Sequence, residues 1–177
     1  RIAPKTGTLH HLAGTGEQGW TGDGGPAKNA KLAGPKGLAL SGRNLYVADT
    51  ESHIIRKVDL NTGIITTVLG TGVRGDGPET DPLQCKLSRP HGLAFYGGKL
   101  YFTAENDQVI GRYDPATDKI ETQFKTGQAT THMVLISADG RHMFTSNIRG
   151  NTVSIFDRGA TAGDWINPTA VAVGRGP

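Results

Sequence analysis

The chain has 177 residues, of which 26 are glycine and 9 are proline, and its formal net charge at pH 7 is +3. It contains no apolar run of about 18 residues, which excludes a membrane-spanning helix, and its single cysteine excludes an intrachain disulfide. Short apolar runs separated by turn signals favour an all-β fold.

The start of the chain matches only the end of a repeat. The stretch "TGTLHHLAG" near the N-terminus compares with "TGIITTVLG" further on, because both place a short strand after a Thr-Gly turn. We therefore predict that residues 1–14 form the outer strand of a preceding blade. On this interpretation the chain is a fragment of a longer protein, or several chains complete one ring.

Two stretches further along repeat each other. "RNLYVADTESHIIRKVD" (43–59) and "GKLYFTAENDQVIGRYD" (98–114) align at an offset of 55 residues without a gap. Each belongs to four predicted strands, in blades covering residues 35–70 and 90–125. The strands predicted for the first blade are Lys36–Leu40, Asn44–Asp49, His53–Asp59 and Ile64–Gly70.

A third, altered repeat covers residues 131–174. Three strands are followed by the long loop "RGATAGDWINP", and Thr169–Val173 is predicted as the outer strand. Four-stranded units at a period of 40–55 residues are typical of a β-propeller. The sequence thus predicts one incomplete propeller domain of three antiparallel blades and one extra strand, whose open edges favour self-association.

The repeats resemble known families. Residues 12–72, with "GDGGPA" and "LYVADTESHIIRKVD", resemble an NHL repeat of the bacterial type. The second repeat resembles NHL repeats more loosely and also the streptogramin lyases and gluconolactonases, whereas "THMVLISADGRHMFTSNIRGNTVSIFD" is similar to the YVTN or surface-layer type. These resemblances imply a ring of six or seven blades when complete.

The lyase resemblance can be checked residue by residue. That family uses a His in its "PHG" segment, a Glu directly after "FT" and a second His three residues later, with magnesium. His91 matches the first of these, but Ala104 stands where the Glu is expected and Asp107 where the second His is expected. The departure argues against lyase activity in this blade.

Pairing of the predicted strands places polar residues at one rim, close to the central opening. It sets Lys36 opposite Asp49 as an ion pair, His91 opposite Ala104, and His132 opposite Ser146. Imidazole, carboxylate and amide groups here can bind a ligand or a metal, although such positions also serve only to satisfy backbone groups. With an aromatic side chain of the first long loop, which can stack on a sugar or a partner, the candidate ligand-binding residues are Trp20, His91, Glu105, His132 and Asn147.

The sequence favours a non-enzymatic binding or scaffold module whose rim loops meet a protein or a carbohydrate. One alternative is a metal-dependent lactonase or lyase with calcium or magnesium in the channel of a complete ring. Another is RNA binding by a basic rim, as some NHL proteins do, although the basic residues do not cluster along the sequence. No resident cofactor is predicted, and a bacterial, periplasmic or extracellular protein is expected.

Overall fold

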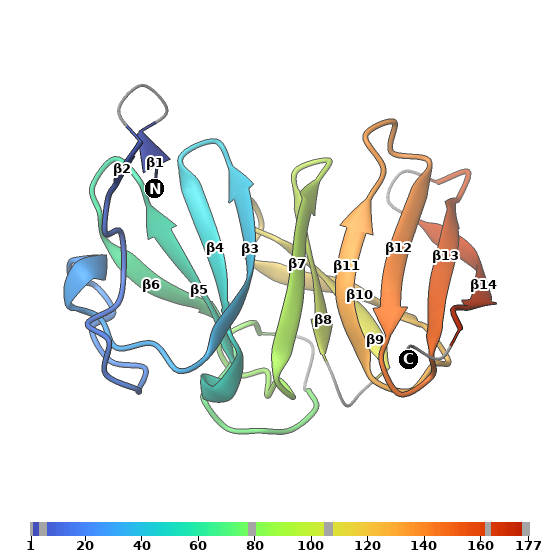
Figure 1. The fold of residues 1–177 in the computed structure, drawn as a ribbon, viewed down its shortest axis with the longest axis horizontal. Helices are drawn as coiled ribbons and strands as arrows, with labels where there is room; N and C mark the ends of the chain where they lie inside the picture. The colour runs from blue at the N-terminus through green and yellow to red at the C-terminus, as the bar shows by residue number, and fades with distance from the viewer. Residues whose placement is uncertain (1, 4–6, 78–80, 105–107, 162–163, 175–177) are drawn as a thin grey trace.

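Three four-stranded antiparallel sheets stand side by side in a row (Figure 1). The computed structural model describes residues 2–3, 7–77, 81–104, 108–161 and 164–174. Within each sheet the strands follow one another in chain order. The predicted all-β fold of four-stranded propeller blades is confirmed, and among the described residues no helix is long and apolar enough to cross a membrane.

The strands of the three sheets are as follows. The first sheet contains β3 (Pro35–Ser41), β4 (Asn44–Asp49), β5 (Ile54–Asp59) and β6 (Ile65–Leu69). The second contains β7 (Pro90–Tyr96), β8 (Lys99–Ala104), β9 (Val109–Asp114) and β10 (Lys119–Lys125). The third contains β11 (Thr131–Ile136), β12 (His142–Asn147), β13 (Thr152–Arg158) and β14 (Trp165–Ala172).

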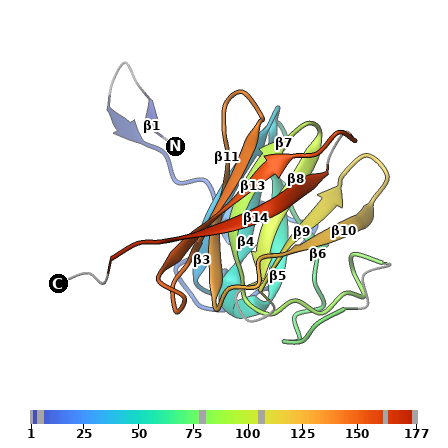
Figure 2. The ribbon, with the colours of Figure 1, turned by 90° about the vertical axis from the view of Figure 1, so that its right-hand side faces the viewer.

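A short hairpin precedes these sheets. Strands β1 (Ile2–Ala3) and β2 (Thr8–Leu9) pair with each other and stand apart from the three sheets (Figure 2). The chain then passes through a long loop with a 3₁₀ turn at Ala27–Asn29 before it enters β3.

The sheets pack face to face, and the inner strand β7 of the second sheet contacts both β3 of the first and β11 of the third. Each sheet has apolar faces that must be buried against a neighbour. Tyr46 of the first sheet stacks on Phe95 of the second, with ring centroids 5.7 Å apart. Tyr101 of the second sheet meets Trp165 of the third edge-on at 6.2 Å. Two apolar layers of the core therefore lie between adjacent sheets, and a third core cluster joins Ala27 and Ala30 of the first long loop to Val58 and Ile65 of the first sheet.

Two glycines permit this close stacking of inner strands. A Cβ on Gly37 of β3 would overlap the carbonyl oxygen of His91 in β7. A Cβ on Gly92 of β7 would lie 2.6 Å from the backbone nitrogen of Val134 in β11. Because both obstacles are backbone atoms, a side chain at either position would force neighbouring sheets apart.

The outer strand of the third sheet differs from its prediction. It begins at Trp165 rather than at Thr169, because Trp165 pairs with Arg158 and Ile166 with Asp157. An irregularity in the ladder between Ile155 and Asp157 accommodates the extra residues. The "NP" dipeptide favours a loop in the sequence, but β14 is the outer strand of its sheet, where proline is tolerated.

Candidate functional site

The described candidate residues belong to strands and connections at the rim where β3, β7 and β11 begin, which is drawn at the bottom of Figure 1 and is called the lower rim below. The pairings predicted for Lys36, His91 and His132 are wrong by one position, because each inner strand has a β-bulge near its start. The observed pairs are Pro35 with Asp49, Pro90 with Ala104, and Met133 with Ser146.

The bulges bring two predicted site residues into contact. His91 is 3% exposed, and the centroid of its ring lies 3.4 Å from that of His132. Thr103 fixes the backbone on both sides of this pair. Its hydroxyl donates to the carbonyl oxygen of His132 at 2.6 Å and accepts from the N–H of Gly92 at 2.8 Å.

The environment of His91 disfavours its protonation. Burial, followed by the positive charges of His132, Lys36 and Arg89, lowers the pKa of His91 to about 4. The imidazole is therefore neutral at neutral pH, and its Nδ1 is buried and has no hydrogen-bond partner within the part of the chain that the structure describes. The stability that this lowered pKa gives is present above the unfolded value of 6.5 and is lost as the pH falls toward 4.

Asn147 occupies the same rim in the third sheet, where it holds neighbouring strands together. It is 2% exposed, and its Nδ2 donates to Thr152 Oγ1 at 3.0 Å and to Ser154 Oγ at 2.9 Å. Its Oδ1 accepts from Thr131 Oγ1 at 3.3 Å. The geometry thus gives Asn147 a structural role, and its binding role stays a prediction. Glu105 lies outside the described residues.

The predicted Lys36–Asp49 ion pair is wrong, because the bulge moves Lys36 out of register. Asp49 is fully buried, and its Oδ1 accepts from the backbone N–H of Ala33 at 2.6 Å, whereas its Oδ2 has no hydrogen-bond partner in the described ranges. Burial raises the pKa of Asp49 to about 6. This carboxyl therefore titrates near neutral pH and ties the first long loop to the end of β4.

A buried arginine holds the same loop from its other end. Arg56 of β5 is fully buried, and its Nη2 lies 2.5 Å from Asp23 Oδ1 in the "GDGG" stretch. It also donates to the carbonyl oxygens of Lys31 and Thr21, at 2.9 and 3.3 Å. Asp23 Oδ2 accepts from the N–H of Thr67 in β6 at 3.0 Å. Sequence reasoning missed this contact, which we call the Arg56 clasp. The available signal was one carboxylate within a glycine-rich loop.

The second long loop, residues 70–89, is anchored beside the first sheet. Thr50 Oγ1 donates to the Pro90 carbonyl at 2.8 Å, and Gly70 N–H donates to the Pro82 carbonyl at 2.9 Å. The Arg89 guanidinium lies 2.6 Å from Glu51 Oε1. The first long loop and the described parts of the second are therefore anchored at the lower rim.

Trp20 links the two long loops. It is 47% exposed, and a Cβ on Gly72 would lie 2.7 Å from its Cζ2 atom. One side of the indole thus covers the second loop while the other faces solvent. Of the predicted residues, Trp20 is the one whose large apolar side chain the structure leaves open to a partner.

Beyond the two histidines, the inner strands line a cavity of about 400 Å³ with chiefly apolar walls, including Leu38, Leu93 and Val134. Within the described residues, no three His, Cys, Asp or Glu side chains gather as metal ligands would.

Comparisons with known sequences point to one type of repeat. Residues 8–93 match the family model of the Teneurin NHL domain. NHL repeat-containing protein 2 of Gallus gallus is 35% identical over 108 residues, which are 60% of this chain and 14% of that protein. Teneurin-3 of Danio rerio is 44% identical over 83 residues, which are 44% of this chain and 3% of that protein.

A plant relative matches as well. Protein SUPPRESSOR OF QUENCHING 1, chloroplastic, of Arabidopsis thaliana is 40% identical over 82 residues, which are 45% of this chain and 8% of that protein. The chain thus spans only a small part of each of these relatives. They come from animals and a plant, so they do not support the expected bacterial source. The YVTN resemblance of the third repeat stays a prediction.

Solved structures share the fold at low identity. The hydrazine synthase of Kuenenia stuttgartiensis has a TM-score of 0.57 at 18% identity, over 88% of this chain and 38% of that one. A chain of a nidogen/laminin complex has a TM-score of 0.55 at 15% identity, over 74% of this chain and 46% of that one. The blades and the sequence matches together support an NHL-type β-propeller.

Proposed function

We propose that the chain is a protein-binding module whose docking surface is the lower rim. NHL propeller domains are typically protein-interaction modules, and the matched family model belongs to that class. Neither the structure nor the matches add an observation in favour of a carbohydrate, RNA or a lactonase substrate. A protein partner is therefore the occupant that we put forward.

The observation that carries this proposal is a set of exposed apolar side chains on the connections of the lower rim. They come from both long loops and from the β12–β13 turn, so segments far apart in sequence contribute to one rim (Figure 1). The four side chains are Trp20 (47% exposed), Val73 (55%), Leu83 (47%) and Ile148 (54%).

Their setting suits a protein interface. Interfaces combine an apolar or aromatic centre with a polar border, and tryptophan is among the residues that contribute most to affinity. Trp20 rests on Gly72, and Val73 follows directly in the chain, so the two loops present these side chains together. Lys31 and Glu17 form an exposed ion pair on the same loop as Trp20, at 2.5 Å.

The test compares the two rims of the sheets. The chain is used to capture proteins from an extract, and the affinity of each captured protein is then measured by calorimetry. Trp20→Ala and Val73→Asp, each made singly, should weaken binding at least tenfold. Arg43→Ala, on the β3–β4 hairpin at the opposite rim, is the matched control and should leave the affinity unchanged.

Two results would overturn the proposal. One is that no protein binds the unaltered chain with measurable affinity. The other is that Arg43→Ala weakens binding as much as the two lower-rim variants do.

A further inference from the structure

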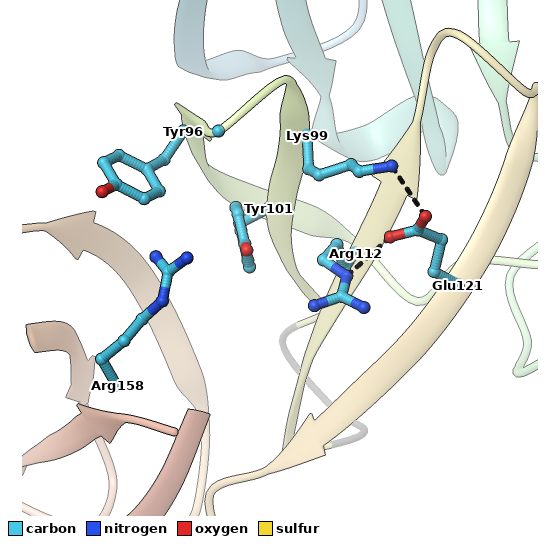
Figure 3. A pocket seen from close by; sticks show the side chains of 7 residues that line it. Tyr96, Lys99, Tyr101, Arg112, Glu121 and Arg158 are labelled. Atoms are coloured by element: carbon cyan, nitrogen blue, oxygen red, sulfur yellow. Dashed lines mark hydrogen bonds and ion pairs between the residues drawn. The ribbon is translucent and has the colours of Figure 1, made fainter. Parts of the chain in front are cut away.

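A second hollow lies between the second and third sheets, at the end of the hairpin that joins β7 to β8. It is a cavity of about 260 Å³, and Figure 3 shows the side chains that surround it. Strands β7 to β10 supply most of them, and Arg158 of β13 reaches in from the third sheet. The lining residues that bear on the argument are Tyr96, Lys99, Tyr101, Arg112, Glu121 and Arg158.

Two of the three cations in this cavity already have carboxylate partners. The Lys99 ammonium lies 2.6 Å from Asp114 Oδ2 and 2.7 Å from Glu121 Oε1. Arg112 Nε lies 2.8 Å from Glu121 Oε2, the other oxygen of the same carboxylate. Figure 3 shows Glu121 between the two cations, on the far side of Tyr101 from Arg158.

Arg158 is held differently. Its guanidinium carbon lies 5.4 Å from the centroid of Tyr96 and 5.5 Å from that of Trp165, and these are cation–π contacts from two sheets. Among the described residues, no carboxylate oxygen lies within ion-pair distance of Arg158. The cavity therefore carries a positive charge that the described side chains leave uncompensated.

Two hydrogen-bond donors at this place also have no acceptor. Arg158 Nη1 and Trp165 Nε1 are both buried, and neither has a hydrogen-bond partner among the described residues. Guanidinium and indole nitrogens can only donate, so each needs an oxygen that the described chain does not provide. A positive charge on the cavity wall, with unused donors on the guanidinium and on the indole beside it, is the combination that binds an oxyanion.

We propose that this cavity binds the carboxylate or phosphate group of a small molecule through the guanidinium of Arg158. The planar guanidinium can donate two parallel hydrogen bonds to such a group. The aromatic rings of Tyr96 and Trp165 keep it in place for that contact. The site lies between the sheets and away from the lower-rim loops, so it does not depend on the proposed docking surface.

The experiment uses the two tryptophans as reporters, since the chain contains Trp20 and Trp165 and no other. The two indole N–H signals are followed by nuclear magnetic resonance during titration with inorganic phosphate and, separately, with acetate at constant ionic strength. Binding should shift the Trp165 signal in a saturable manner while the Trp20 signal stays constant. Saturation by one anion and not by the other identifies the group that is bound.

Variants connect the signal to Arg158. Arg158→Gln should weaken binding at least tenfold, whereas Arg149→Gln, an exposed arginine of the β12–β13 turn, should have no effect. Trp165→Phe assigns the indole signal, and calorimetry on this variant shows whether the indole donor contributes. If Arg158→Gln does not fold, Arg158→Lys keeps the charge and loses the paired donors, so it should still weaken binding.

The titration of the unaltered chain is decisive by itself. Shifts of the Trp165 signal that grow linearly with both anions would mean that no anion binds in the cavity, and they would overturn the proposal. Saturable binding that is undiminished in the Arg158 variants would mean that the anion binds elsewhere, and it would overturn the proposal as well.

Discussion

At equivalent positions of the lower rim, the first sheet buries ionisable side chains and the third sheet buries neutral polar side chains. Asp49 and Asn147 each end the second strand of their sheet, and Arg56 and Ser154 occupy matching positions on the third strand. The first sheet therefore buries ionisable groups where the third sheet buries an amide and a hydroxyl.

The origin of the partners explains what this difference means. Arg56 donates to groups from the first long loop, including Asp23, whereas Asn147 bonds to Thr131, Thr152 and Ser154 of its own sheet. An amide and a hydroxyl both donate and accept, so they can satisfy each other locally. A buried guanidinium needs an anion and several acceptors. The buried polar groups of the first sheet thus find their partners in the first long loop, whereas those of the third sheet find them within their own sheet.

The largest expected effect comes from removing the anion of the Arg56 clasp. Asp23→Ala leaves a fully buried guanidinium without its carboxylate and should lower the free energy of unfolding by about 3 kcal/mol. Urea denaturation measures it. The matched control is Asp76→Ala, in the similar "GDG" stretch of the second loop, where Gly111 takes the place of Arg56. If Asp23→Ala and Asp76→Ala lower the free energy of unfolding by the same small amount, the Arg56 clasp does not determine the position of the first long loop.

The next effect tests the spacing between sheets. Gly37→Ala should destabilise the chain by about 2 kcal/mol, because the new Cβ overlaps the His91 carbonyl, which is rigid backbone. At the equivalent position the third sheet has Met133, which is 47% exposed. Met133→Ala should change the free energy of unfolding by less than about 0.5 kcal/mol. Equal losses in the two variants would contradict the close approach.

The smallest effect concerns Asp49 and has a pH signature. Burial raises its pKa to about 6 from 3.8, so the folded chain holds a proton that the unfolded chain releases between these values. Its contribution to stability therefore falls as the pH rises through this window. Asp49→Asn keeps an acceptor for Ala33 and should stabilise the chain by about 1 kcal/mol at pH 7.5 and by nothing near pH 4.

The reverse substitution completes the comparison. Asn147→Asp places a carboxyl among the hydroxyls of Thr131, Thr152 and Ser154, and it should destabilise the third sheet increasingly as the pH rises above about 5. Unfolding curves at several pH values measure both variants. A gain from Asp49→Asn that is the same at pH 4 and pH 7.5 would show that the carboxyl is not protonated in the folded chain.

The sequence predicted the blades well because their information is local and repeated. Turns such as Gly42-Arg43 and Gly97-Gly98, together with the 55-residue offset, place the first two sheets almost to the residue. The lower rim was harder to predict, because a single bulge near the start of each inner strand shifts Lys36, His91 and His132 out of register. Pairing rules that assume a regular hydrogen-bond ladder do not predict the extra residue of a β-bulge.

The missed contacts are those between segments distant in sequence. Arg56 and Asp23 are 33 residues apart in sequence, with strands β3 and β4 between them, and nothing in the local pattern connects them. The same holds for Arg158, which meets Tyr96 from another sheet. In the sequence, the "GDGG" stretch served only as part of the NHL resemblance, whereas the structure shows that its carboxylate has a specific partner.

The Arg56 clasp has a thermodynamic consequence for anything that docks beside Trp20. The first loop gives up its conformational freedom when the chain folds, so a partner does not have to order it at the moment of association. Affinity at this surface should therefore depend on a residue that no partner touches. A substitution that breaks the Arg56 clasp would weaken binding because the partner would then have to order the first long loop, although the contact residues themselves would be unchanged.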